Sequence, residues 1–305
     1  MTAAIEVDDL KKTYRGRKTG EINAVDGVSF RVEEGEFFGI LGPNGAGKTT
    51  TLEIVEGLRR PDSGDVRLLG SSPWPHSPAL AARIGVQLQA SAFFEFLSAR
   101  EQIETFARLY GAGEARAAAM LEEVGLADSA NVRAEKLSGG QKQRLSIACA
   151  LVGDPELVFL DEPTAALDPQ ARRNLWDLIR KINGEGRTVV LTTHYMEEAE
   201  ALCDRVAIMD AGRVRAIGSP RELIASLEAP TRISVASGQL DAARVGELAA
   251  GEPVREEGGL TVFETRDPQK LLTELAAAGA LEDLAVRTAS LEDVFLEVTG
   301  REWRE

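Results

Sequence analysis

A glycine-rich loop between an apolar strand and an apolar helical pattern is the feature that most constrains this chain. The strand is predicted over residues 36–41, and the helical pattern follows the loop directly. The segment that joins them reads Gly42-Pro43-Asn44-Gly45-Ala46-Gly47-Lys48-Thr49-Thr50. A strand, a loop of this composition and a helix in that order are the setting that a P-loop requires, which predicts an α/β fold. The alternative is a turn that merely joins strand to helix, but such turns rarely carry Lys-Thr at this offset.

The composition of this loop indicates phosphate binding. Gly42, Gly45 and Gly47 lack a Cβ, so the backbone can take positive φ and aim successive amides at phosphate oxygens beside a helix N-terminus. Lys48 supplies a point cation to the β and γ phosphates, and the Thr49 hydroxyl is placed to ligate Mg²⁺. We therefore expect the whole segment to bind a nucleoside triphosphate, ATP, together with Mg²⁺.

Two further apolar runs end in side chains suited to phosphate chemistry. Residues 157–160 lead into Asp161 and Glu162, and residues 188–191 lead to His194. Buried parallel strands deliver such residues to their carboxyl edge, where open α/β sheets bind ligands. Asp161 is expected to orient Mg²⁺ and Glu162 to polarise the attacking water, while His194 would bond the γ phosphate or hold that water. Strand-end acids and histidines are also common structural features, so these assignments depend on the P-loop.

A second loop with the features of an anion site lies at residues 137–144, which read Leu-Ser-Gly-Gly-Gln-Lys-Gln-Arg. Ser138 and the amides of Gly139 and Gly140 would form an anion cradle at the N-terminus of the following helix. One P-loop does not need two cradles for the same γ phosphate, so the second cradle implies a nucleotide supplied by a partner. The alternative is an ordinary helix N-cap followed by a solvated polar face.

This second loop resembles the signature motif of ABC-type ATPases, and the other motifs follow that family's order along the chain. The resemblance implies that Tyr14 stacks on adenine, that Gln89 is the Q-loop glutamine that reaches Mg²⁺ and assists catalysis, and that Asp168 is the D-loop aspartate. Each also has a structural alternative: a strand-end aromatic, a surface amide and a helix N-cap. The resemblance further implies a head-to-tail homodimer, with ATP held between Lys48 of one subunit and Ser138 of the other.

The fold that the resemblance implies is a P-loop NTPase of ABC type. It has a RecA-like core, an antiparallel β subdomain and a helical subdomain at about residues 91–135, which in such proteins receives the permease. Phe93, Phe94 and Phe96 would contribute to that contact or pack in the core. The family usually has glycine where Ala166 stands, and a positive φ there would strain alanine by about 1 kcal/mol.

The C-terminal part of the chain differs from the motif-bearing part. The ATPase domain is expected to cover residues 1–227 and to close with a hairpin over 206–217 and a helix from Arg221, leaving 228–305 as a small α+β accessory domain. Within the accessory domain we expect strands over 232–235, 260–264 and 286–288, and helices over 268–278 and 290–300. The last helix has Ser290 as N-cap and Gly300 as its stop, and it resembles the tail of daunorubicin-type exporter ATPases.

Composition bounds the location and partners of the chain. No apolar run reaches the roughly 18 residues of a membrane-spanning helix, and the N-terminus lacks the layout of a secretory signal. We therefore expect a cytoplasmic protein held on the inner face of the cell membrane by a permease. A net charge of -14 argues against nucleic acid as a partner. Cys149 and Cys203 are expected to be buried structural thiols.

The sequence thus predicts the ATP-hydrolysing subunit of an ABC transporter, which energises export through a separately encoded permease. The cargo stays open between a drug, a lipid and a polysaccharide. One competing reading is a soluble ABC ATPase acting on ribosomes or DNA, but such proteins usually carry paired cassettes or a long coiled coil between the motifs. Another is a nucleotide-dependent switch or kinase, which gives the loop at Ser138 no purpose.

Overall fold

The computed structural model describes residues 2–16, 20–89 and 93–301, and the chain forms two compact units in it. The first unit runs to Pro220 and the second begins at Arg221, shortly before the boundary near Leu227 that the sequence suggested. The motifs from Tyr14 to His194 therefore all belong to the first unit.

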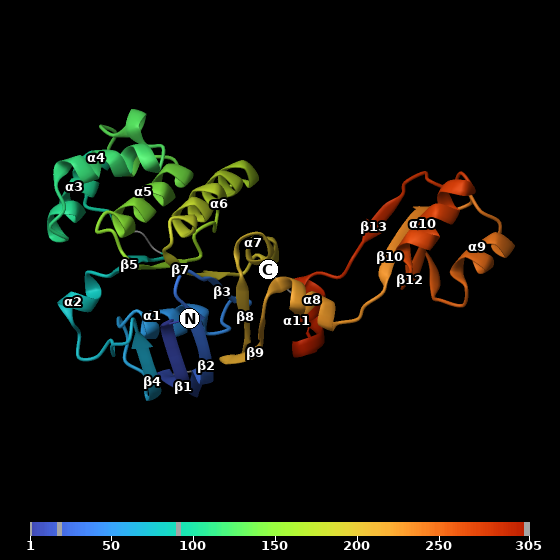
Figure 1. Cartoon of the computed structure of the whole chain (residues 1–305), viewed down its shortest axis with the longest axis horizontal. Helices are drawn as coiled ribbons and strands as arrows, with labels where there is room; N and C mark the ends of the chain where they lie inside the picture. The colour runs from blue at the N-terminus through green and yellow to red at the C-terminus, as the bar shows by residue number, and fades with distance from the viewer. Residues whose placement is uncertain (1, 17–19, 90–92, 302–305) are drawn as a thin grey trace. The chain divides into compact units, whose positions relative to one another are not determined.

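A six-stranded sheet with the order β5-β6-β7-β3-β8-β9 forms the centre of the first unit (Figure 1). Its strands are β3 (Phe37–Leu41), β5 (Ile84–Gln87), β6 (Leu157–Asp161), β7 (Thr188–Thr193), β8 (Arg205–Asp210) and β9 (Arg213–Gly218). Neighbours are parallel except β8 and β9, which form an antiparallel hairpin. Because β6, β7 and β3 are adjacent, parallel and buried along their length, their carboxyl ends meet at one sheet edge.

A smaller antiparallel sheet, with the order β2-β1-β4, packs against the central one. Its strands are β1 (Ala3–Gly16), β2 (Gly20–Glu33) and β4 (Ser63–Leu68). Val28, Phe30 and Val32 alternate with exposed residues on β2, so one face of this sheet is apolar. The Phe30 ring stacks on Phe38 of β3 with 5.3 Å between ring centroids, which joins the two sheets in one core.

Seven α-helices surround these sheets in the described part of the first unit. They are α1 (Lys48–Val55), α2 (Pro78–Ala81), α3 (Ala99–Leu109), α4 (Glu114–Glu123), α5 (Gly139–Leu151), α6 (Pro169–Gly184) and α7 (Met196–Leu202). Two short 3-10 helices, η1 (Ala127–Ser129) and η2 (Ala134–Lys136), precede α5. The helices α3, α4 and α5 contact one another and form the helical part of the unit (Figure 1).

The second unit contains a four-stranded antiparallel sheet with the order β11-β12-β10-β13. Its elements are α8 (Pro220–Ser226), β10 (Thr231–Ala236), α9 (Ala242–Ala249), β11 (Val254–Glu257), β12 (Leu260–Thr265), α10 (Pro268–Ala277), β13 (Ala285–Arg287) and α11 (Leu291–Thr299). Ile233, Val235 and Phe263 of the sheet form a buried cluster with Leu248 of α9 and Leu275 of α10. The two helices therefore cover one face of this sheet.

Most of the predicted elements are present, and two elements of the second unit were missed. The hairpin of β8 and β9 and the tail helix α11 are confirmed, the latter with Ser290 at its N-cap and Gly300 at φ 67. The sequence reading overlooked α9 and β11. Gly246 interrupts the pattern of α9, and β11 has Val254 as its one apolar residue, so neither shows clear periodicity.

Cys149 and Cys203 are free and buried, as expected, and burial raises the pKa of the Cys149 thiol to about 12. Within the described residues, no helix has both the length and the apolar character that crossing a membrane requires.

Candidate functional site

The loop between β3 and α1 is shaped by its glycines. Gly45 and Gly47 have φ values of 81 and 99, as expected, and a Cβ on Gly47 would stand 2.2 Å from the Ala24 carbonyl oxygen. The expectation of positive φ was wrong for Gly42, which lies outside that region. Glycine is needed there because a Cβ would stand 2.4 Å from the carbonyl oxygen of Met209. The loop thus combines two left-handed residues, Gly45 and Gly47, with two close backbone approaches, at Gly42 and Gly47.

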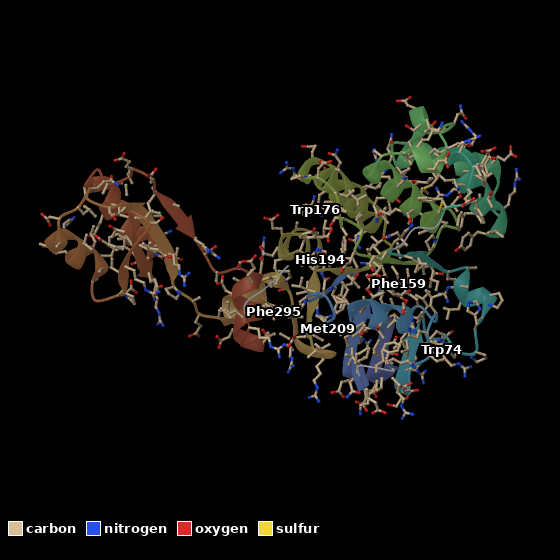
Figure 2. All side chains as sticks on the ribbon, turned by 180° about the vertical axis from the view of Figure 1, so that it is seen from behind. Trp74, Phe159, Trp176, His194, Met209 and Phe295 are labelled. Carbon is tan, nitrogen blue, oxygen red and sulfur yellow. The ribbon has the colours of Figure 1, made fainter. Side chains whose placement is uncertain are left out.

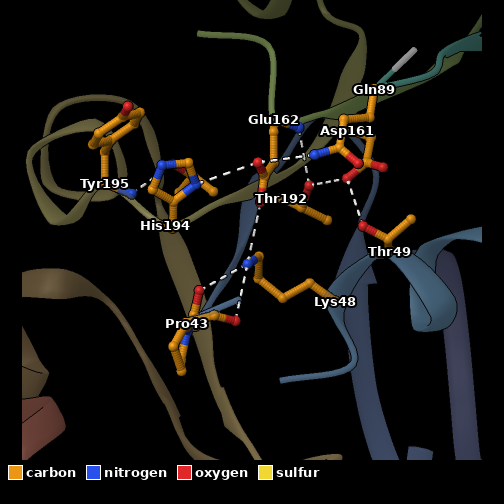
Figure 3. A network of polar contacts seen from close by, with 11 residues as sticks. Pro43, Lys48, Thr49, Gln89, Asp161, Glu162, Thr192, His194 and Tyr195 are labelled. Carbon is orange, nitrogen blue, oxygen red and sulfur yellow. Dashed lines mark hydrogen bonds and ion pairs between the residues drawn. The ribbon is translucent and has the colours of Figure 1, made fainter. Parts of the chain in front are cut away.

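Lys48, the first residue of α1, is the cation at the centre of the site. Its side chain is 4% exposed, and Nζ donates to the carbonyl oxygens of Gly42 at 2.8 Å and Pro43 at 3.3 Å. Nζ also lies 3.3 Å from Glu162 Oε1 (Figure 3). Burial lowers the pKa of Lys48, while the charges of Glu162 and Asp161 oppose that shift. The ammonium is therefore held in place by the carbonyl groups of its own loop and by Glu162, which follows β6.

Asp161, at the end of β6, is paired with two hydroxyl groups. Thr49 Oγ1 donates to Asp161 Oδ1 at 3.3 Å, and the Thr192 hydroxyl of β7 donates to the same oxygen. Burial raises the pKa of Asp161, whereas these two hydroxyls and the charge of Lys48 act in the opposite direction. A threonine hydroxyl and a carboxylate are thus placed side by side, which are oxygen ligands of the kind that Mg²⁺ prefers.

Glu162 follows Asp161 and is the residue on which the site converges. Its φ of 47 is in the left-handed region that non-glycine residues rarely adopt, and its N–H donates to Thr192 Oγ1 at 3.0 Å. Gln89 Nε2 donates to Glu162 Oε2 at 3.2 Å, and His194 Nδ1 lies 3.3 Å from that oxygen without hydrogen-bond alignment. The predicted catalytic residues Lys48, Gln89, Glu162 and His194 are therefore brought together around one carboxylate (Figure 3).

Tyr14 lies apart from this cluster, on β1. Its ring is half-buried, and the guanidinium carbon of Arg59 lies 5.4 Å from the ring centroid. Arg59 is held in turn by Glu53 of α1, with 2.6 Å between Nε and Oε2. The structure places Tyr14 on the sheet that packs beside α1, and its predicted contact with adenine stays a prediction.

The loop at Ser138 forms a second polar site in the described part of the first unit. Ser138 is the N-cap of α5 and makes a capping box with Gln141. Ser138, Gly139 and Gly140 line a hollow of about 230 Å³ together with Ala166 and Asp168. No residue of segment 42–50 lines that hollow, so the two predicted phosphate sites remain separate within the chain.

Two residues of this hollow have specific backbone roles. Asp168 is the N-cap of α6, where its Oδ1 accepts from the N–H groups of Gln170 at 3.0 Å and Ala171 at 2.9 Å. The helix N-cap that was the structural alternative for Asp168 is therefore present. Ala166 has a φ of 61, so the position where the family usually has glycine does adopt a positive φ in this chain.

Another hollow, of about 410 Å³, adjoins Gln89. It is lined by Phe93, Phe94, Glu95 and Phe96 from one segment and by Ala134, Glu135, Gly139, Lys142 and Gln143 from another. Phe94 and Phe96 are 51% and 67% exposed, so core packing does not account for them. Gln102 of α3, which is fully buried, donates to the Phe94 carbonyl oxygen at 2.6 Å and accepts from its N–H at 3.2 Å. This amide fixes the backbone that presents the two rings.

Thr192 and Gln102 are the residues here that the sequence reading did not single out as functional. Thr192 could have been recognised from the sequence, because it lies at the end of the same apolar strand that leads to His194. A hydroxyl at that position lies at the carboxyl edge of the sheet, beside the acids at the end of β6. Gln102 offered no such signal, since a glutamine in an amphipathic helix is usually solvated.

A phosphate-type loop after a buried strand, with the acids of the parallel strand β6 beside its lysine, defines a P-loop nucleoside triphosphatase. A family model described as ABC transporter matches residues 25–165. The chain is 44% identical, over 99% of both chains, to the Nod factor export ATP-binding protein I of Paraburkholderia xenovorans. It is 41% identical to the daunorubicin resistance ATP-binding protein DrrA3 of Streptomyces coeruleorubidus, over 99% of this chain and 97% of the relative.

Solved structures agree with that assignment. A dimeric ATP-binding cassette in a post-hydrolysis state with ADP and Pi superposes with a TM-score of 0.64 at 30% identity, over 70% of this chain and 98% of its own. The chain therefore belongs to the ABC transporter ATP-binding proteins, and it is an ATPase of that family.

Proposed function

We propose that the chain powers export through a separately encoded integral membrane permease. The observation that carries this proposal is the convergence of Lys48, Asp161, Glu162 and His194 at one sheet edge, with a second, separate anion-type loop at Ser138. The relatives named for Nod factor export and daunorubicin resistance support export as the direction. For the cargo we propose a drug-like molecule, a lipid or a polysaccharide, to be recognised by the permease.

In the proposed mechanism, the amides of residues 42–50 and the Lys48 ammonium hold the phosphates of ATP. Glu162, which already lies against Gln89 and His194, polarises the water that attacks the γ phosphate. His194 holds the γ phosphate or that water. Tyr14 stacks on the adenine.

For Mg²⁺, we propose Thr49, Asp161 and Gln89 as the residues that hold it. Thr49 Oγ1 and Asp161 Oδ1 lie 3.3 Å apart, and a hydroxyl beside a carboxylate fits a cation that also takes phosphate oxygens as ligands. When bound, Mg²⁺ would neutralise charge on the β and γ phosphates.

We infer that two copies of the chain close head to tail on two ATP molecules. Ser138, Gly139, Gly140 and Asp168 then contact the nucleotide of the other copy, because within one copy they lie apart from the P-loop. The structural neighbour described as dimeric supports this arrangement.

The hollow beside Gln89 is the proposed docking site for the permease. Its exposed rings, Phe94 and Phe96, match an apolar helix end, and Gln89 connects the hollow to Glu162.

We also propose that residues 1–227 are the ATPase domain, that 228–305 are an accessory domain, and that the protein works at the cytoplasmic face of the membrane.

Replacing Glu162 by Gln tests the proposed function. The amide keeps the size of the side chain but cannot polarise water, so turnover should fall about 10²- to 10⁴-fold while ATP binding persists. An ATP-dependent dimer should then accumulate, as measured by size-exclusion chromatography with light scattering. Glu156→Gln, an exposed change just before β6, is the matched control. Normal turnover in Glu162→Gln, or an ATP-loaded variant that stays monomeric, would contradict the assignment.

A further inference from the structure

Glu198 of α7 is a buried carboxylate that the proposed mechanism does not use. Its side chain is 0% exposed, while its neighbour Glu197 faces solvent. A buried carboxylate is costly unless polar groups compensate it. Trp176 Nε1, from α6, donates to Glu198 Oε1 at 3.0 Å. The presence of Glu198 on the inner face of α7 therefore calls for a structural or functional reason.

The groups around Glu198 come from three segments of the site. Burial raises its pKa, and the nearby hydroxyls of Thr193 and Thr164, the Trp176 donor and the charge of Arg172 oppose that shift. Oε1 accepts from Trp176, while Oε2 has no aligned hydrogen-bond partner among the described residues. Thr193 directly precedes His194, Thr164 comes shortly after Glu162, and the other two residues lie on α6. The Glu198 carboxylate thus lies close to three segments. They are the segment after Glu162, the segment before His194, and α6, whose N-cap is Asp168.

A second contact joins the same segments. The Arg172 guanidinium lies 4.0 Å from the centroid of the Tyr195 ring, and that ring lies 4.1 Å from the ring of His194. Arg172 and Trp176 are one helical turn apart on the same face of α6. Arg172 contacts Tyr195, the N-cap of α7, and Trp176 contacts Glu198 in the first turn of α7. Figure 2 shows Trp176 and His194 on these neighbouring segments.

His194 is sensitive to such anchoring. Its Nδ1 lies 3.3 Å from Glu162 Oε2 but lacks hydrogen-bond alignment, so a small shift of the segment that leads into α7 would change this contact. We propose that Glu198 is a positioning residue for His194, which anchors the start of α7 to α6 and so sets the place of the imidazole during hydrolysis. This inference rests on the proposed role of His194.

The test is a double-mutant cycle on the full chain with Glu198→Gln and His194→Ala. The amide keeps an acceptor for Trp176 and the side-chain volume but removes the charge that Arg172 and the threonine hydroxyls compensate. We expect Glu198→Gln to lower kcat about tenfold with the KM for ATP changed less than about twofold. In the His194→Ala background the same change should lower kcat less than about twofold, because the residue it positions is absent.

Two further variants keep the result interpretable. Glu197→Gln makes the same charge change on the exposed side of α7 and should leave kcat within about twofold of the unmodified chain. Trp176→Phe removes the donor to Glu198 and should lower kcat in the same direction as Glu198→Gln, with ATP binding retained.

An equal loss of kcat in both backgrounds, an unchanged kcat in Glu198→Gln, or a parallel rise of KM would overturn the proposal. A His194→Ala variant with normal turnover would instead refute the role assigned to His194, so the two failures are distinguishable. Thermal unfolding of each variant separates loss of positioning from loss of folding.

Discussion

The cluster around Lys48 and the loop at Ser138 differ in where their polar groups find partners. Lys48, Asp161 and Glu162 are almost completely buried, and they bond to one another and to Thr49 and Thr192 within the chain. Ser138 and Gly139 are exposed beside an open hollow. Both sites begin a helix, so the helix N-terminus alone does not determine their chemistry.

This difference explains why the two sites need different partners. A buried cation close to two buried carboxylates has its charge compensated inside the protein. The loop at Ser138 offers exposed donors beside a hollow that Arg144 also lines, and in the described part of the chain these donors have no buried acid to pair with. The comparison supports the proposal that the Lys48 cluster binds ATP and that the loop at Ser138 completes a site across an interface.

The sharpest way to break this comparison is Gly139→Asp. A Cβ at Gly139 would meet nothing within 4 Å, and an acidic residue in the first turn suits a helix N-terminus, so the variant should fold. Its carboxylate would repel the γ phosphate of the opposite subunit. We expect turnover to fall about 10²- to 10³-fold while the isolated chain still binds ATP with unchanged affinity. Turnover assays and equilibrium nucleotide binding measure the two effects.

Gly139→Ala is the control, since it adds a Cβ to the same free space without charge and should change turnover far less. Lys48→Ala should differ from Gly139→Asp in the binding measurement, because it should abolish ATP binding as well as turnover. If the Gly139→Asp chain hydrolyses ATP at full speed as a monomer, the loop at Ser138 has no part in the nucleotide site.

The sequence predicted the residues of the two sites better than their surroundings. Lys48, Asp161 and His194 could be placed because glycine spacing and apolar strands determine which sheet edge they reach. The contacts of Glu198 and Gln102 could not, because the burial of a polar side chain depends on which helix packs over it. In the segment 196–202, Glu198 is indistinguishable from its solvated neighbours until α6 covers one face.

The fold shows the same limit. Continuous apolar strands and capped helices were recognised, whereas β11 is polar and is held by pairing with β12. The turn Gly258-Gly259, with φ values of 59 and 82, was a usable hairpin signal, because two-residue turns of this type need positive φ. The stability of β11 comes from its hydrogen bonds to β12, and the sequence of β11 by itself does not reveal that pairing.

A second prediction concerns the charge balance of the buried region. Burial, followed by the charges of Asp161 and Glu53, raises the pKa of Glu56 at the end of α1 to about 8. Because this folded-state pKa lies above the unfolded one, the stabilisation is complete below the unfolded pKa and is lost as pH rises towards 8. Glu56→Gln should therefore be more stable than the unmodified chain at pH 9, by on the order of 2 kcal/mol.

Denaturant unfolding between pH 5.5 and 9 measures this effect, and the advantage of the variant should grow with pH. Glu53→Gln is a companion variant on the same helix: Glu53 is half-exposed and paired with Arg59, and because its charge raises the pKa of Glu56, its removal should reduce the pH dependence without abolishing it. A stability difference that does not vary with pH would show that Glu56 is not a neutral, buried acid in the folded chain.

The smallest expected effect lies at the exposed site, at Ala166. Its φ of 61 is strained for alanine, so Ala166→Gly should relieve about 1 kcal/mol, partly offset by the greater freedom of glycine in the unfolded chain. Ala165→Gly is the matched control, because Ala165 is not among the positive-φ residues and should only be destabilised by the change, by about 0.5–1 kcal/mol. The two variants should thus shift the free energy of unfolding in different directions or by clearly different amounts. Equal destabilisation would mean that the left-handed turn beside Asp168 stores no strain, and that the hollow at Ser138 keeps its shape without it.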